Sequence, residues 1–276
     1  MSAHTNGPEL LQENVGVLKS RMGTFYPGSH VIFRGHDLHE DLKDMDWVEL
    51  YVFGITGRRF AKEQLWLIHS MLTYTSYPDV RLWNNRVAAL AGSSRSTGTL
   101  GMAAALAVSE ASIYGGGILA RTVDFFVRTQ RLLECGENIA DCISKELAER
   151  RIIGGYGRPI INADERIEPL LELAKKLSLD QGPHLRLAFA VEKELLDSGR
   201  LHLKMNYAAL IAALGADIGL TPREFSLLMF PLFLAGMPPG FIEASDRPEG
   251  TLYPISCTDI LYEGKPKRSW FKQSVG

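Results

Sequence analysis

A chain of 276 residues, 46% hydrophobic and 22% charged, has the composition of a soluble globular protein with one large domain or two modest ones. The formal net charge of -2 gives no electrostatic reason to expect nucleic acid or an anionic membrane as the main partner. The three cysteines are too few and too irregularly spaced for a disulfide framework or a zinc site. We therefore predict a cytoplasmic protein that holds no metal.

Hydrophobic residues recur at helical spacing along most of the chain, which predicts a mainly α fold. The expected helical segments are residues 37–72 with a break at 54–57, 84–90, 98–112, 118–133, 137–150, 163–177, 185–196, 206–214 and 222–234. Strand-like alternation is confined to residues 26–34 and 251–255. The apolar stretch 225–242 approaches the length of a membrane span, but its prolines favour a buried helix that ends in a Pro-Gly turn.

Three segments stand out as candidates for chemistry: Tyr114-Gly115-Gly116-Gly117, Gly155-Tyr156-Gly157-Arg158 and Lys204-Met205-Asn206. In this order they resemble the active-site segments of the citrate synthase and citryl-CoA lyase family, which typically read His-Gly-Gly, Gly-Phe-Gly-His and Asn-Val-Asp. Further similar segments are Phe33-Arg34-Gly35-His36-Asp37-Leu38, Asp164-Glu165-Arg166 and Leu261-Tyr262-Glu263-Gly264. The resemblance extends from about residue 31 to about residue 270.

The resemblance implies a helical fold in which a smaller helical domain closes over the substrates bound to a large one. The large domain would comprise residues 1–114 and 216–276, and the small domain residues 115–215. The resemblance also implies a homodimer or a higher homo-oligomer, with coenzyme A or an acyl-CoA as a substrate.

The three positions that carry catalysis in the family are replaced by Tyr114, Arg158 and Asn206. An amide has no useful basicity, so Asn206 cannot be a general base; it either caps a helix or hydrogen-bonds to substrate. Tyr114 either donates a hydrogen bond to a thioester oxygen or is a packed core tyrosine. Arg158 can bind a carboxylate in a bidentate manner but does not transfer protons.

The resemblance places the contacts to the second substrate at Arg166, Ser76 and Met237. Arg166 matches a carboxylate-binding arginine, with an exposed helix-start arginine as the alternative. Ser76 lies where a substrate histidine is expected and Met237 where a second arginine is expected, so a dicarboxylate would be poorly neutralised.

The expected CoA loop supplies cations and backbone N–H groups suited to phosphates. Its cofactor-binding candidates are Arg151, Gly154, Gly155 and Gly157.

Two hypotheses follow from this pattern. The first is a divergent acyl-CoA-dependent enzyme that forms or breaks a carbon–carbon bond with an acceptor other than oxaloacetate. The second is a catalytically inactive homologue that acts as a binding or scaffolding subunit. The donors retained at Tyr114 and Arg158 favour the first, and the loss of the proton-transferring residues favours the second.

Overall fold

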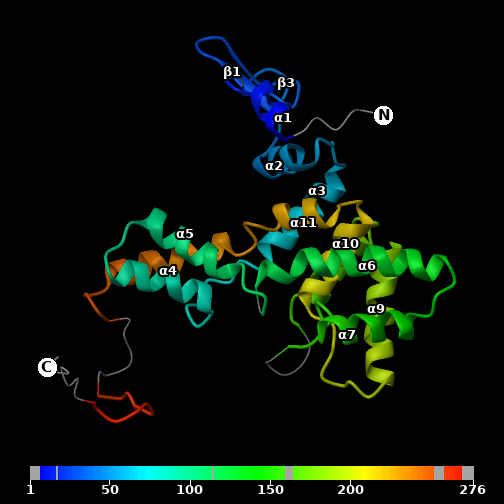
Figure 1. Cartoon of the computed structure of the whole chain (residues 1–276), viewed down its shortest axis with the longest axis vertical. Coiled ribbons are helices and arrows are strands. Elements are labelled where there is room, and N and C mark those ends of the chain that lie inside the picture. The colour runs from blue at the N-terminus through cyan, green and yellow to red at the C-terminus, as the bar shows by residue number, and fades with distance from the viewer. Residues whose placement is uncertain (1–6, 17, 114, 159–163, 252–257, 269–276) are drawn as a thin grey trace, which may run out of the picture. The chain divides into compact units, whose positions relative to one another are not determined.

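The structure, a computed structural model, describes residues 7–16, 18–113, 115–158, 164–251 and 258–268. Helices dominate these residues, which confirms the predicted mainly α class (Figure 1). In chain order the helices are α1 (Gly7–Glu13), α2 (Trp47–Thr56), α3 (Lys62–Thr73), α4 (Trp83–Ser93), α5 (Gly98–Ser109), α6 (Leu119–Glu134), α7 (Ile139–Arg150), α8 (Ile167–Lys176), α9 (Pro183–Asp197), α10 (Tyr207–Asp217), α11 (Pro222–Leu228) and α12 (Met237–Asp246). Short 3-10 turns, η1 (Gly116–Ile118) and η2 (Leu234–Gly236), precede α6 and α12.

A small antiparallel sheet precedes α2 and has the strand order β1 (Gly23–Tyr26), β2 (His30–Phe33) and β3 (His36–Asp37). The expected strand at 26–34 is therefore a hairpin whose turn falls at residues 27–29. The other expected strand, 251–255, lies almost entirely outside the described residues.

The helix predicted to begin at residue 37 begins at Trp47 instead. The Asp37 side chain accepts hydrogen bonds from the backbone N–H groups of His39 and Glu40, at 2.8 and 3.0 Å. Such local bonds compete with helical ones, so residues 38–44 form turns although the apolar residues here have helical spacing.

The apolar stretch 225–242 contains the ends of two helices, so the single buried helix predicted there is wrong. Helix α11 ends at Leu228, and α12 begins at Met237 with prolines in its first turn. A proline there leaves no hydrogen bond unmade, because the first N–H groups of a helix have no partner within it. Among the described residues, no helix is long and apolar enough to cross a bilayer.

The chain divides into two compact units. The first comprises residues 1–77 and 106–235, and the second residues 78–105 and 236–276, so that α5 begins in one and ends in the other. These bounds differ from those of the large and small domains expected from the resemblance, which stay a prediction.

The core of the first unit surrounds α10. Every residue from Tyr207 to Ala216 except Ala208 is buried, and α6 and α9 pack against this helix. A helix that is apolar on all sides belongs in a core. A Cβ atom on Gly215 would lie 2.5 Å from the ring of Phe225, so the start of α11 also approaches α10 closely.

In the second unit, α4 and α12 form the principal helix pair. A Cβ atom on Gly92 would collide with the carbonyl oxygen of Phe241, so the two backbones touch at this point. The guanidinium of Arg95 then donates to the carbonyl groups of Ser245 and Arg247, which ties the ends of the two helices together.

A capping box formed by Thr221 and Glu224 holds the start of helix α11, and its contribution to stability can be measured. The Thr221 hydroxyl accepts a hydrogen bond from the N–H of Glu224, and the Glu224 carboxylate accepts one from the N–H of Thr221. Thr221→Ala should lower the free energy of unfolding by about 1 kcal/mol, because it removes one side of this capping box. Thr221→Ser keeps the hydroxyl and should stay near wild type in urea denaturation. Equal losses for the two variants would show that the methyl group, and not the cap, matters.

Candidate functional site

Two of the three segments singled out in the sequence lie side by side. The Asn206 N–H donates to the Gly155 carbonyl at 2.8 Å, and the Gly157 N–H donates to the Lys204 carbonyl at 2.8 Å. Tyr156 and Met205 pair between these bonds as an isolated β-bridge. We call residues 154–157 the glycine loop, and these bonds fix it against the residues that lead into the buried helix α10.

Asn206 is the N-cap of α10. Its Oδ1 accepts a hydrogen bond from the N–H of Ala208 at 2.9 Å, and its Nδ2 donates to the carbonyl of Gly157 at 2.8 Å. The capping alternative is therefore realised. Both ends of the amide are used within the protein, one for the helix and one for the glycine loop.

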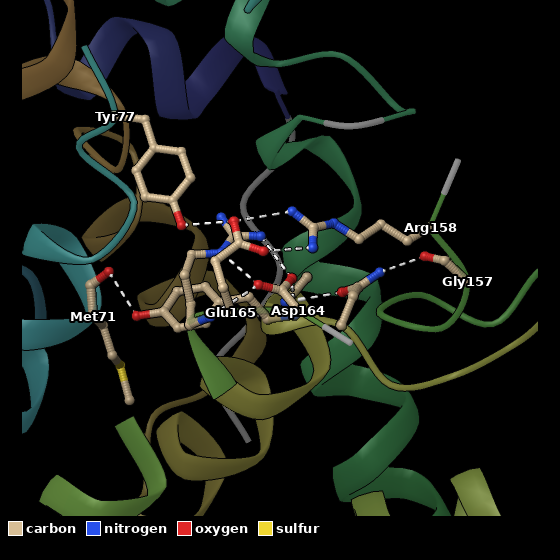
Figure 2. A network of polar contacts seen from close by, with 10 residues as sticks. Met71, Tyr77, Gly157, Arg158, Asp164 and Glu165 are labelled. Carbon is tan, nitrogen blue, oxygen red and sulfur yellow. Dashed lines mark hydrogen bonds and ion pairs between the residues drawn. The ribbon is translucent and has the colours of Figure 1, made fainter. Parts of the chain in front are cut away.

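A cluster of charged and aromatic side chains lies beside this junction (Figure 2). We call it the arginine cluster, and it consists of Tyr77, Arg158, Asp164, Glu165, Arg166 and Tyr207. It contains two arginines and two carboxylates, so its charges balance.

Arg158 binds the Glu165 carboxylate through both terminal nitrogens of its guanidinium group. Nη1 donates to Oε2 at 2.7 Å and Nη2 to Oε1 at 3.2 Å, and the Tyr77 hydroxyl donates to Oε1 at 2.9 Å (Figure 2). The hydrogen bonds from Arg158 lower the pKa of Glu165 to about 2. Burial raises the pKa of Tyr77 to about 12, and its hydrogen bond to the Glu165 carboxylate acts in the same direction. Glu165 is thus an anion and Tyr77 a neutral donor over the physiological pH range.

Arg166 is held by a different carboxylate. Its Nε and Nη2 donate to the two oxygens of Asp164 at 2.8 and 2.7 Å, and its guanidinium lies 5.6 Å from the ring of Tyr77 and 4.6 Å from that of Tyr207. Its side chain is only 20% exposed, so Arg166 is not the solvated helix-start arginine of the alternative.

Asp164 supports both Arg166 and the start of α10. Its Oδ2 also accepts a hydrogen bond from the N–H of Tyr207 at 2.9 Å. Burial alone would raise the pKa of this carboxyl, but the hydrogen bonds from Arg166 and its positive charge lower it. Asp164 is therefore a fixed anion inside the protein.

The glycines of the expected CoA loop are required by packing. A Cβ atom on Gly154 would collide with Oγ1 of the buried Thr122. At Gly155, where φ is +84°, it would lie 2.5 Å from the backbone nitrogen of Ala209 in α10. Gly157 also has a positive φ, and Arg151 is the exposed C-cap of α7. Phosphate binding by these four residues stays a prediction.

The remaining candidates lie elsewhere or outside the described part of the chain. The Ser76 hydroxyl donates to the Leu72 carbonyl at 2.9 Å, a bond to the last turn of α3. Met237 is fully buried at the start of α12 and belongs to the other compact unit. Tyr114 lies outside the described residues. Its role and those of Ser76 and Met237 stay predictions.

Four members of the arginine cluster, Tyr77, Asp164, Glu165 and Tyr207, were not among the site residues predicted from the sequence. Glu165 and Tyr207 each adjoin a residue that was predicted, Arg166 and Asn206. The position of Tyr77 next to Ser76 was the only sequence signal for its part in the cluster. Within the described part of the chain, no group of three or more His, Cys, Asp or Glu side chains is placed to hold a metal ion.

The packing of Gly155 generates a matched prediction, because Gly199 has the same φ of +84° but a Cβ atom there would have no neighbour within 4 Å. Gly199→Ala should cost only the strain of the left-handed conformation, about 1–2 kcal/mol of unfolding free energy. Gly155→Ala should cost about 2–5 kcal/mol, because the strain is joined by overpacking against α10. Urea denaturation of both variants measures the difference. Equal losses would contradict the close approach of the loop to α10.

Of the comparisons with known proteins, the one with solved structures indicates a fold. No protein-family model matches the sequence, and no curated protein sequence does so, but many solved structures match. Citryl-CoA lyase from Hydrogenobacter thermophilus is 19% identical, with a TM-score of 0.79, over 92% of this chain and 97% of that one.

Two larger proteins also match. ATP citrate lyase from Methanosaeta concilii, solved as a variant in complex with (3S)-citryl-CoA, is 18% identical with a TM-score of 0.70, over 95% of this chain and 44% of that one. Citrate synthase from Thermoplasma acidophilum, solved with carboxymethyl coenzyme A and oxaloacetate, is 18% identical with a TM-score of 0.63, over 83% of this chain and 59% of that one. This chain therefore spans about half the length of these two proteins and nearly all of the lyase. The chain has the citrate synthase-like fold, as the resemblance of its short segments predicts.

Proposed function

We propose that this protein is an acyl-CoA-dependent enzyme that forms or breaks a carbon–carbon bond, and that its acceptor is not oxaloacetate. The fold supports the first part, because solved proteins that share it include a citryl-CoA lyase and structures in complex with CoA compounds. The observation that carries the proposal is the bidentate grip of Arg158 on a carboxylate beside the glycine loop. A guanidinium so placed suits a carboxylate-bearing acceptor.

The charge balance of the arginine cluster supports an acceptor less anionic than a dicarboxylate. Arg166 is committed to the buried Asp164, whose side chain is 0% exposed. Arg158 is paired with Glu165, whose side chain is 55% exposed. Of the two arginines in this cluster, Arg158 is therefore the one whose carboxylate partner lies at the surface. One arginine with a surface partner suits one carboxylate.

In this proposal each selected residue has a distinct role. Arg158 binds the acceptor carboxylate, Tyr114 donates a hydrogen bond to the thioester oxygen, and Asn206 holds the glycine loop with one N–H of its amide and offers the second N–H to the substrate. The backbone of the loop at Gly154, Gly155 and Gly157, together with the side chain of Arg151, binds the CoA phosphates. Ser76 is assigned to acceptor recognition, and the protein acts in the cytoplasm as a homodimer or a higher homo-oligomer.

A second candidate function, an inactive homologue that serves as a binding or scaffolding subunit, is favoured by the acid–base chemistry of the cluster. General acid–base catalysis works best with a group whose pKa lies near the working pH. In the arginine cluster the pKa values of both carboxyls are lowered and those of both tyrosines are raised. None of these described groups therefore changes its protonation near neutrality, and Asn206 has no basicity.

The two candidates differ in measurable ways. The enzyme should bind CoA or acetyl-CoA in calorimetry and should exchange the acyl protons of acetyl-CoA with deuterated water. Arg158→Ala should lower kcat/KM by about 10- to 150-fold, the equivalent of about 1.5–3 kcal/mol for one charged hydrogen bond. Tyr114→Phe should also lower it.

A matched control is Arg59→Ala, which breaks an ion pair of similar length, 3.2 Å to Glu49 on α2, and should leave turnover unchanged. If neither CoA binding nor proton exchange is found, the enzyme proposal fails and the binding subunit remains. If turnover with any acyl-CoA is lost in Arg158→Ala or Tyr114→Phe, the binding subunit is refuted.

A further inference from the structure

Glu165 has the geometry of a bound carboxylate ligand rather than of a surface side chain. Its two oxygens take Nη1 and Nη2 of Arg158 at 2.7 and 3.2 Å, the fork-to-fork arrangement in which arginine binds substrate carboxylates. The Tyr77 hydroxyl adds a third donor to Oε1 at 2.9 Å (Figure 2). A cation and a neutral donor converge on one carboxylate, as they would on an incoming acid.

The adjacent carboxylate shows what a structural partner looks like in the same cluster. Asp164 has no exposed side-chain surface, holds Arg166 and accepts from the backbone N–H of Tyr207, so removing it would leave buried groups unpaired. Glu165, one residue later, is 55% exposed and accepts hydrogen bonds from the side chains of Arg158 and Tyr77.

This contrast decides which carboxylate can be replaced. Water reaches the Glu165 carboxylate and competes for its charge, so this pair contributes less to stability than a fully buried one. We therefore expect the fold to depend less on Glu165 than on Asp164. Another carboxylate can therefore take the place of Glu165 while the arginine cluster keeps its shape.

We infer that Arg158 and Tyr77 form a binding site for a small monocarboxylate, which the chain fills with its own Glu165 and from which the ligand displaces that side chain. Glu165 then sets the specificity of the site, because only a ligand that matches its contacts to both donors can replace it. This inference rests on the proposed function, since the monocarboxylate is the acceptor of that reaction.

The charge states support the exchange over a wide pH range. The Tyr77 hydroxyl keeps its proton up to its pKa of about 12, and Glu165 keeps its charge down to its pKa of about 2. Glu165 and a ligand acid therefore compete for Arg158 as two carboxylates. A neutral isostere lacks the negative charge that pairs with the guanidinium, so it cannot displace Glu165.

The test measures binding of pyruvate and of acetate by ligand-observed NMR, with acetamide as the neutral control. An attached carboxylate competes at an effective concentration in the millimolar range or above, so Glu165→Ala should bind pyruvate about tenfold or more tightly than wild type. Glu165→Gln, which keeps the shape and loses the charge, should show a gain of the same sign. Arg158→Ala alone should bind pyruvate no more tightly than wild type, and Arg158→Ala added to Glu165→Ala should abolish the gain of the latter. Acetamide should not bind measurably to any variant.

The matched control is Glu49→Gln, which removes the carboxylate of the Arg59–Glu49 pair and should leave pyruvate binding at the wild-type level. The inference is overturned if both Glu165 variants, folded by circular dichroism, bind pyruvate no more tightly than wild type, or if Glu165→Ala/Arg158→Ala keeps the gain. CoA binding by calorimetry on the same proteins separates this failure from failure of the proposed function. Tighter pyruvate binding by the Glu165 variants without CoA binding supports the monocarboxylate site and contradicts the proposed enzyme. CoA binding without tighter pyruvate binding overturns the monocarboxylate site and leaves the proposed enzyme standing.

Discussion

The amino end of α10 is the point on which the rest of the site depends. The helix is almost wholly buried, so its first backbone N–H groups need partners inside the protein. Asn206 satisfies one of them and Asp164 another, at 2.9 Å each. The residues that cap the core helix are therefore the same residues that hold the glycine loop and Arg166.

This shared duty explains why the loop and the cluster form one assembly. Gly155 lies against Ala209, and only a residue without a side chain lets the loop come this close to the helix backbone. Asp164 fixes Arg166 between two tyrosine rings, and the chain then presents Glu165 to Arg158. Hydrogen bonds from the amino end of α10 therefore hold the loop and the arginine cluster in place against the hydrophobic core.

Most helices and the fold could be predicted because apolar periodicity and short glycine segments depend on nearby residues. The predicted start at residue 37 was wrong because Asp37 binds local backbone N–H groups, a competition that hydrophobic spacing does not record. The prediction that a helix in 225–242 ends in a Pro-Gly turn was wrong, because these prolines stand in the first turn of α12 and begin a helix instead of ending one. The contact of Tyr77 with Glu165 joins residues 88 positions apart, and no local pattern encodes such a pairing.

The double hydrogen bond of Asn206 also restricts how this site could change over evolution. An aspartate at that position would cap α10 equally well, but it would turn two acceptors, its carboxylate and the carbonyl of Gly157, toward one another. Replacement of Asn206 by aspartate therefore takes more than one substitution, because the Gly157 carbonyl must first gain another donor. The chemistry available at position 206 is therefore tied to the position of the glycine loop, and the two can change only together.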